Sequence, residues 1–228
     1  MDKCLKKPIA IALISFVAVF SPFAVKATIE TATTPKTDIT VVLDAGHGGI
    51  DGGVSGINTG VKESDLNLEI VRELKNQLEN SGINVVLTRK TKSGLYGAAT
   101  KGFKRRDMEK RKEIINSSDA DAFVSIHLNY YSSPNRRGAQ AFFKEGDEDG
   151  ERFAQIMQNR LNELSGQIRP FSPLKGDYYV LNESEPPATL IECGFLSNAE
   201  DEALLTTVAY RKELAEKITL GIKEMLFS

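Results

Sequence analysis

Residues 39–49 read ITVVLDAGHGG, a run of β-branched and apolar residues that ends on a histidine set among glycines. An uninterrupted apolar run of this kind is typical of a strand buried on both faces. A second run, residues 120–126, leads to His127, the only other histidine of the chain. Strand ends in α/β folds often carry the chemistry, because a rigid sheet holds their side chains at an open crevice. His47 and His127 are therefore candidate functional residues.

From residue 39 onward, strand patterns alternate with helical ones. The order strand–loop–helix–strand favours a parallel sheet covered by helices. We therefore expect a single α/β domain, phosphorylase/hydrolase-like, with a twisted, mostly parallel or mixed sheet of about six strands flanked by helices. The expected strands cover residues 39–43, 83–88, 120–126, 138–143, 178–181 and 188–193. The expected helices run from Asp65 to the Ser81-Gly82 break and over residues 107–116, 150–164 and 209–225.

The N-terminal 27 residues have the pattern of an export signal. Three lysines precede an apolar stretch at residues 9–20, a serine and a proline then break any helix, and small residues surround Ala27. We expect residues 1–27 to be a signal peptide, the Thr-rich residues 28–38 to be a linker, and residues 39–228 to be the functional domain. An uncleaved membrane anchor is the alternative, although the stretch is short for a span of about 20 residues.

Charge and cysteine usage restrict the function further. The net charge is −2, and cleavage after Ala27 would remove four lysines and one aspartate, which lowers the charge to −5. An acidic chain without a basic block is a poor nucleic-acid binder, and nothing beyond the N-terminal segment predicts contact with a membrane. Cleavage would leave Cys193 as the one cysteine, so we expect an exported protein without an internal disulfide.

Two carboxylates complete a set of residues that suits a metal. Glu63 follows a glycine-rich loop and precedes a helix, whereas Glu192 interrupts an apolar strand. Each has a simpler interpretation: an acid at a helix N-terminus, or a strand carboxylate paired with a neighbour. Two histidines and a glutamate are, however, the ligand set of a class of zinc hydrolases, to which a second glutamate adds the base. The candidate ligands are thus His47, Glu63 and His127, and the candidate base is Glu192.

Residues beside these four have candidate supporting roles. Asp44, three residues before the first histidine, either orients its imidazole or only ends the strand. Asn129 lies two residues after the second histidine, on the same side of an extended chain, and is a candidate donor to a substrate. Alternation places Cys193 on the face opposite Glu192, which favours a small buried hydrophobe over a nucleophile.

Several stretches together resemble the zinc-dependent N-acetylmuramoyl-L-alanine amidases of the bacterial cell wall, the amidase-3 family. They are LDAGHGG at 43–49, KESDLNL at 62–68, LTR at 87–89, SIHLN at 125–129 and LIECGFLSN at 190–198. The resemblance implies that His47, Glu63 and His127 hold one Zn2+ ion and that Glu192 is catalytic. It also implies that the substrate is peptidoglycan, cleaved at the amide between N-acetylmuramic acid and L-alanine.

Within the family, the loop TKGFKRR at 100–106, the N-terminal segment and the lack of wall-binding repeats are similar to the spore-cortex amidases of endospore-forming bacteria. This similarity implies export to the cell wall or spore-cortex region. It also implies a role in cortex maturation, where removal of stem peptides is a step toward muramic-δ-lactam that a deacetylase completes. Cys193 is a departure, since relatives often carry valine or another small residue there.

The roles of two arginines and three alternative functions remain open. In the implied reaction, Arg89 or Arg106 meets the carboxylates of the stem peptide through its planar guanidinium, although both suit a solvated surface equally well. The first alternative is a zinc peptidase that cuts within the stem peptide. The others are a cysteine hydrolase built on Cys193, and a peptidoglycan-binding protein that is non-catalytic or depends on an activating partner.

Overall fold

Strand β1 (Thr40–Ala45) runs through the interior of the domain, and its last five residues are buried. The structure is a computed structural model that describes residues 38–228, and these belong to one compact unit. The expected signal peptide and all but the last residue of the expected linker lie outside the described residues. β1 pairs in parallel with β2 (Asn84–Leu87) on one side and with β3 (Ala122–Asn129) on the other. The carboxyl ends of these strands therefore meet at one edge of the sheet.

The remaining strands complete a six-stranded mixed sheet with the order β2-β1-β3-β6-β4-β5. β6 (Ala188–Phe195) lies parallel to β3, whereas β4 (Gln140–Phe143) is antiparallel to β6, and β5 (Leu174–Lys175) is parallel to β4. The prediction of a single α/β domain with a mixed sheet of about six strands is confirmed.

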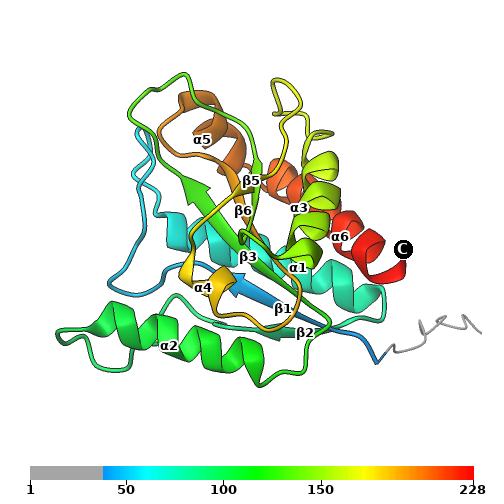
Figure 1. The fold of residues 1–228 in the computed structure, drawn as a ribbon. Coiled ribbons are helices and arrows are strands. Elements are labelled where there is room, and N and C mark those ends of the chain that lie inside the picture. Colours follow the sequence, from blue (N-terminus) through cyan, green and yellow to red (C-terminus); the bar gives the residue numbers. More distant parts are fainter. Residues whose placement is uncertain (1–37) are drawn as a thin grey trace, which may run out of the picture. The chain divides into compact units, whose positions relative to one another are not determined.

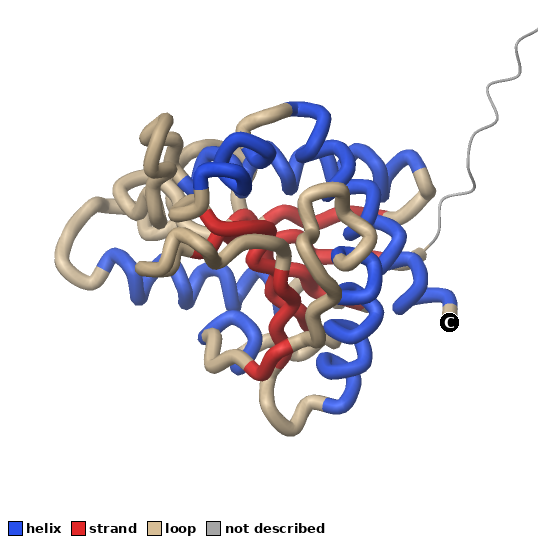
Figure 2. The backbone as a smooth tube through the Cα atoms, turned by 90° about the horizontal axis from the view of Figure 1, so that it is seen from above, coloured by secondary structure: helices blue, strands red, loops and turns tan. Residues whose placement is uncertain are grey.

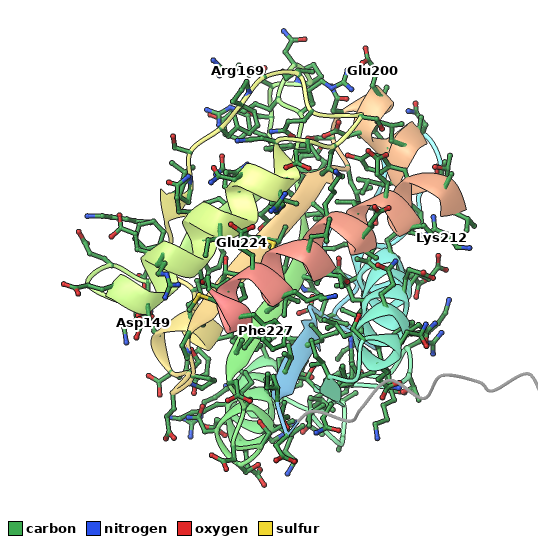
Figure 3. All side chains as sticks on the ribbon, turned by 90° about the vertical axis from the view of Figure 1, so that its right-hand side faces the viewer. Asp149, Arg169, Glu200, Lys212, Glu224 and Phe227 are labelled. Carbon is green, nitrogen blue, oxygen red and sulfur yellow. The ribbon has the colours of Figure 1, made fainter. Side chains whose placement is uncertain are left out.

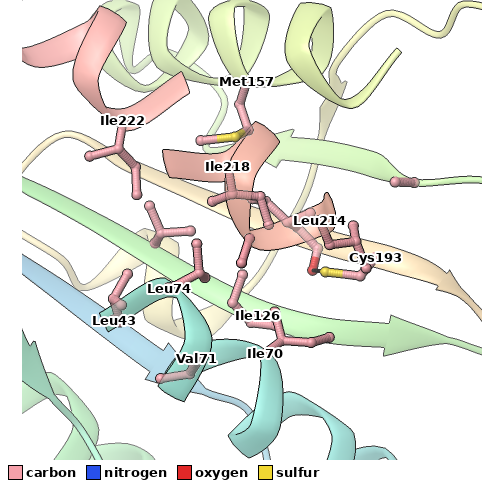
Figure 4. Close-up of a cluster of buried hydrophobic side chains, with 14 of the residues drawn as sticks. Leu43, Ile70, Val71, Leu74, Ile126, Met157, Cys193, Leu214, Ile218 and Ile222 are labelled. Carbon is pink, nitrogen blue, oxygen red and sulfur yellow. Dashed lines mark hydrogen bonds between the residues drawn. The ribbon is translucent and has the colours of Figure 1, made fainter. Parts of the chain in front are cut away.

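The larger hydrophobic core lies on one face of this sheet. It is covered by α1 (Glu63–Asn80), α3 (Glu148–Leu161) and α6 (Val208–Phe227), and α6 packs against both other helices. Figure 4 shows side chains of these helices meeting Leu43 and Ile126 of the sheet. This core holds the strands rigidly and so fixes the positions of the residues at their ends.

The other face carries a smaller core. Here α2 (Phe103–Asn116) and the short α4 (Tyr179–Asn182) cover Val42 and Phe123 of the sheet. Figure 1 shows α2 and α4 on the side of the sheet away from α6, and Figure 2 shows helices on both sides of the strands. Among residues 38–228, none of the helices is both long and apolar enough to span a membrane.

Residues 178–181, expected to form a strand, instead form the N-cap and the first three residues of the helix α4. Val180 and Leu181 are neighbours in sequence and both are buried in the smaller core, which a helical turn permits and the alternation of a strand does not. The strand beside β4 at the edge of the sheet is β5. The strand prediction for this segment is therefore wrong.

Helix α5 (Ala199–Leu205) follows β6 and is absent from the sequence-based prediction. The Asn198 side chain caps it by accepting hydrogen bonds from the N–H groups of Glu200 and Asp201, each at 3.0 Å. An asparagine followed by acidic residues is a signal for the start of a helix. Seven residues are, however, too few to show a helical repeat of apolar positions.

A buried arginine joins α2 to the end of β1. Arg111 is 1% exposed, and its guanidinium forms ion pairs with Asp44 and with Asp107, the latter at 2.7 Å. It also donates hydrogen bonds to the carbonyl oxygens of Ala45 (2.9 Å) and His47 (2.5 Å). The Arg111 side chain thus fixes the backbone where the chain leaves β1.

Asp44 is equally enclosed, and its carboxylate accepts hydrogen bonds from Thr88 (2.5 Å) and Ser125 (2.8 Å). Burial alone would raise the pKa of Asp44, but the Arg111 guanidinium and the Thr88 hydroxyl hold the pKa below its ordinary value. Because the folded-state pKa is depressed, the ionised carboxylate stabilises the fold above the unfolded-state pKa of about 3.9. That contribution is lost as the pH falls through the folded-state pKa.

We expect Arg111→Ala to lower the free energy of unfolding by about 3–5 kcal/mol, because it leaves buried carboxylates without their partner. Arg105→Ala is a matched control on the same helix. The Arg105 side chain is 82% exposed, so the expected change is within about 0.5 kcal/mol. Urea denaturation followed by circular dichroism measures both variants, and equal midpoints would contradict the assignment of Arg111.

Candidate metal centre

His47 occupies the turn that follows β1, in the left-handed region with a φ of 62°. Few residues other than glycine adopt this conformation, and the hydrogen bond from Arg111 to the His47 carbonyl holds it in place. Both ring nitrogens have partners: Nδ1 lies 3.1 Å from Asp51 Oδ1, and Nε2 lies 3.2 Å from Glu63 Oε1. Burial would lower the pKa of His47, but the hydrogen bonds to Asp51 and Glu63 raise it to about 9.

The carboxylate that orients His47 is therefore Asp51, four residues further along the chain. Asp44, which the sequence offered for this role, contacts Arg111 and two hydroxyl groups instead. Asp51 lies in the glycine-rich loop, where no periodic pattern marks it. Its spacing from His47 is the only signal that sequence reasoning could have used.

His127 reaches the same place from β3. Its Nδ1 lies 3.0 Å from Glu63 Oε1, and the two imidazoles meet edge to face with centroids 5.0 Å apart. The His127 ring packs directly over Gly46, where a Cβ atom would come within 2.3 Å of it. The turn that brings the two histidines together therefore requires glycine at residue 46.

Glu63 begins α1 and contacts both imidazoles. The residue is 2% exposed; Oε1 also accepts a hydrogen bond from the N–H of Leu128 (3.1 Å), and Oε2 accepts one from the N–H of Val54 (2.9 Å). Burial would raise the pKa of Glu63, but hydrogen bonds to the two imidazoles hold it far below its ordinary range. Glu63 is thus a fixed, ionised carboxylate, and the simpler interpretation as a solvated acid at a helix N-terminus is wrong.

These three side chains can hold one metal ion. One ligand atom each from His47, Glu63 and His127 lies within 4.8 Å of the others. Two imidazole nitrogens and one carboxylate oxygen form a donor set that suits zinc and related first-row ions. The structure therefore brings together the three predicted ligands from the ends of β1 and β3 and the start of α1.

Glu192 lies on β6 beside His127 of β3, in register and on the same face of the sheet. It is 8% exposed, and its Oε2 atom is buried without a hydrogen-bond partner among residues 38–228. Burial raises the pKa of Glu192 to about 7, opposed by the His127 imidazole and reinforced by the charge of Glu63. A carboxylate with a pKa near neutrality is suited to take up and release a proton.

Cys193 faces away from this site. It is 1% exposed and lies in the larger core, near Leu214 in Figure 4. Burial raises the pKa of the thiol, so the reactive thiolate does not form near neutral pH. The prediction of a small buried hydrophobe is confirmed, which removes Cys193 as the nucleophile of a cysteine hydrolase.

Arg89 supports the backbone of the site. It is 3% exposed, and its guanidinium donates to the carbonyl oxygens of Ala45 (2.8 Å), Gly46 (3.0 Å) and Ser64 (2.7 Å). Burial and the nearby charge of Arg111 lower the pKa of Arg89 to about 10. The N–H groups of Arg89 are occupied by these carbonyl oxygens. Arg89 therefore supports the backbone and does not make the predicted contact with stem-peptide carboxylates.

Arg106 is also engaged with the protein's own backbone. It donates to the carbonyl oxygens of Tyr96 (3.1 Å), Ala98 (2.7 Å) and Lys101 (3.0 Å), and so fixes the loop that precedes α2. These bonds replace the predicted contact of Arg106 with the substrate. Asn129, the candidate substrate donor, lies at the end of β3 in the lining of a cavity of about 390 Å³.

A smaller cavity of about 120 Å³ lies beside the two imidazoles. His47 and His127 line it together with Tyr178 and Tyr179, which stand at the start of α4. The candidate metal centre is thus reached from the face of the sheet that carries α2 and α4.

The chain matches, over residues 41–224, a protein family described as N-acetylmuramoyl-L-alanine amidase. The germination-specific N-acetylmuramoyl-L-alanine amidase of Bacillus subtilis (strain 168) is 35% identical over 192 residues, which cover 82% of this chain and 80% of that protein. N-acetylmuramoyl-L-alanine amidase AmiA of Escherichia coli (strain K12) is 29% identical over 228 residues, covering 80% of this chain and 74% of that protein.

Solved structures agree with these relatives. The CwlD amidase from Clostridioides difficile, determined in complex with the GerS lipoprotein, has a TM-score of 0.78 and 37% identity, and the match covers 83% of this chain and 98% of that chain. The catalytic domain of CwlV, an N-acetylmuramoyl-L-alanine amidase from Bacillus (Paenibacillus) polymyxa var. colistinus, has a TM-score of 0.73 and 30% identity, with 82% and 98% covered. The family resemblance inferred from the motifs is confirmed.

The burial of Cys193 predicts that iodoacetamide leaves this thiol unmodified in the folded protein and labels it after denaturation, since alkylation needs an accessible thiolate. Peptide mapping by mass spectrometry distinguishes Cys193 from Cys4. Hydrolytic activity is expected to survive treatment of the folded protein. Rapid labelling of Cys193 in the native state, with parallel loss of activity, would contradict the assignment.

Proposed function

The chain belongs to the amidase-3 family of N-acetylmuramoyl-L-alanine amidases, and we propose that it acts through one zinc ion held by His47, Glu63 and His127. It is a hydrolase of the amide bond between N-acetylmuramic acid and L-alanine in peptidoglycan. The observation that carries the zinc proposal is the convergence of two imidazoles and a buried carboxylate from three separate segments.

The donor chemistry and the surrounding charges fit a zinc ion. Glu63 is held ionised by its neighbours and His47 is oriented by Asp51, an arrangement in which a carboxylate fixes the ring of a ligating histidine. The buried Oε2 atom of Glu192, unpartnered among the described residues, lies next to this donor set. When bound there, a zinc ion would supply a Lewis acid that polarises the scissile carbonyl and lowers the pKa of water to about 7.

In the proposed mechanism, Glu192 moves the proton. Its carboxylate accepts a proton from the attacking water and then donates it to the nitrogen of the departing L-alanine. A pKa of about 7 allows Glu192 to be ionised at the first step and protonated at the second. Arg111 and Arg89 do not touch the substrate; they hold the backbone that positions His47.

The site of action follows from the substrate and from the relatives. Peptidoglycan lies outside the cytoplasmic membrane, and we propose that residues 1–27 direct export and that the chain acts in the spore cortex, on the path to muramic-δ-lactam. The germination-specific amidase of Bacillus subtilis and the clostridial CwlD relative support this role. The complex of that relative with the GerS lipoprotein supports a protein partner for this chain as well.

The ligand assignment predicts about one zinc per wild-type chain and almost none in His127→Ala, because two ligands do not retain the ion through dialysis. Asp65→Asn is the matched control. This residue lies two residues after Glu63 on α1, pairs with Lys92 at 3.1 Å, and is expected to leave the metal content unchanged. Elemental analysis by mass spectrometry measures all three proteins, and equal zinc in wild type and His127→Ala would refute the assignment.

For the catalytic role, Glu192→Gln is expected to keep its zinc and to lose about 10²–10⁴-fold in the rate of stem-peptide release, because the amide cannot act as a base. Glu163→Gln, an exposed carboxylate beyond the end of α3, serves as the control and should keep wild-type activity. Mass spectrometry of digested sacculi gives both rate and product. Intact stem peptides are expected, whereas shortened peptides would indicate a peptidase.

For the cortex role, the chain is expressed in a Bacillus subtilis strain that lacks its germination-specific amidase. The cortex of these spores is expected to regain muramic-δ-lactam with the wild-type chain and not with Glu192→Gln. Chromatography and mass spectrometry of cortex muropeptides measure the lactam. A cortex without lactam, from cells in which the exported enzyme cleaves vegetative peptidoglycan, would contradict the role in spores.

A further inference from the structure

We propose that the cavity of about 390 Å³ beside Glu192 is the subsite for the acidic stem peptide, and that Arg136 and Arg169 bind the carboxylate of its second residue. The inference rests on the proposed function and adds to it the direction in which the substrate lies. The peptide extends from the candidate metal centre across β4 toward β5, and the glycan extends the other way.

Strand pairing places residues of the cavity lining next to Glu192 and its strand β6. Gln140 of β4 is the in-register neighbour of Glu192, and Asn129 of β3 is the neighbour of Phe195 on β6. These residues, except Glu192, line the cavity. Phe142, also in the lining, packs edge to face against Tyr178, which lines the smaller cavity beside the histidines. The two cavities therefore lie on either side of this aromatic pair.

The charged side chains that line the cavity are all positive. The lining contains three arginines and no carboxylate. Arg137 forms ion pairs with Glu200 and Asp201, so its charge is already balanced. Within residues 38–228, neither Arg136 nor Arg169 forms an ion pair.

Both unbalanced guanidinium groups lie over aromatic rings instead. Arg136 lies 4.5 Å from the centroid of Tyr131, and Arg169 lies 5.4 Å from that of Phe171. Stacking orients a guanidinium without occupying its N–H edge, which stays available to a carboxylate.

The loop that carries Arg169 is anchored on both sides. Gln167 accepts a hydrogen bond from the N–H of Ala139 (2.8 Å), and Gln140 donates one to the carbonyl of Ser172 (2.7 Å). Figure 3 shows Arg169 at the same end of the domain as Glu200. A tethered loop presents its arginine at a defined distance from the sheet, as a specificity-determining residue requires.

The chemistry of the substrate selects the peptide over the glycan as the occupant. The lactyl carboxyl of the sugar is consumed in the scissile amide, so the negative charges near the cleaved bond belong to the peptide. Adjacent strands are about 4.8 Å apart, so β5 lies roughly 10 Å from β6. An extended chain advances about 3.5 Å per residue, which places the second residue of the stem between β4 and β5.

The test uses the zinc-loaded protein and two synthetic N-acetylmuramoyl tripeptides, one with D-glutamate and one with D-isoglutamine at the second position. They differ by one carboxylate. The wild type is expected to prefer the acid, and Arg136→Gln and Arg169→Gln are each expected to lower the acid-to-amide ratio of kcat/KM roughly 3- to 10-fold. Arg169→Lys, which keeps the charge, is expected to recover part of the preference.

Arg152→Gln is the control, because this exposed arginine lies on α3 and donates to Ser228, and it should keep the wild-type ratio. A wild-type ratio of one, or an unchanged ratio in both glutamine variants, would overturn the subsite while hydrolysis itself continues. If the zinc-loaded wild type released no peptide from either substrate, the proposed function would be overturned, and the subsite with it.

Discussion

The structure depends on one buried carboxylate that several separate segments must satisfy at once. Glu63 contacts His47 and His127 and accepts backbone hydrogen bonds from Val54 and Leu128. Burying an ionised carboxylate costs several kcal/mol unless partners surround it. The glycine-rich loop, the start of α1 and the ends of β1 and β3 are therefore stable only where they converge on this group, and that convergence is the candidate metal centre.

Two buried arginines complete the arrangement by binding backbone carbonyl oxygens. Arg111 holds those of Ala45 and His47, and Arg89 holds those of Ala45 and Gly46. A turn that places His47 in a left-handed conformation leaves its carbonyl groups without partners in the sheet, and the guanidinium groups supply them. The positive charges of Arg89 and Arg111 bind the protein's own backbone, so other residues must supply the charge that recognises the substrate. The free arginines of the larger cavity meet this requirement.

The sequence predicted the α/β fold because buried strands carry long apolar runs, and it singled out candidate residues where a polar side chain interrupts or ends such a run. His127 and Glu192 were found for this reason. The roles of Asp51 and Arg111 could not be predicted in this way. Asp51 lies in a loop without periodicity, and Arg111 belongs to a highly charged helix that suits a solvated surface. Bonds from side chains to distant backbone carbonyls leave no pattern in the sequence, and for the same reason Arg89 and Arg106 were expected at the substrate.

We propose that His47, Glu63 and His127 coordinate one zinc ion and that Glu192 lies beside the ion without binding it. X-ray absorption spectroscopy at the zinc edge of the purified, zinc-loaded protein tests this directly. We expect four to five nitrogen and oxygen neighbours at about 2.0–2.2 Å, with the multiple scattering of two imidazoles and no sulfur. A sulfur neighbour at about 2.3 Å, or a shell without imidazole scattering, would contradict it.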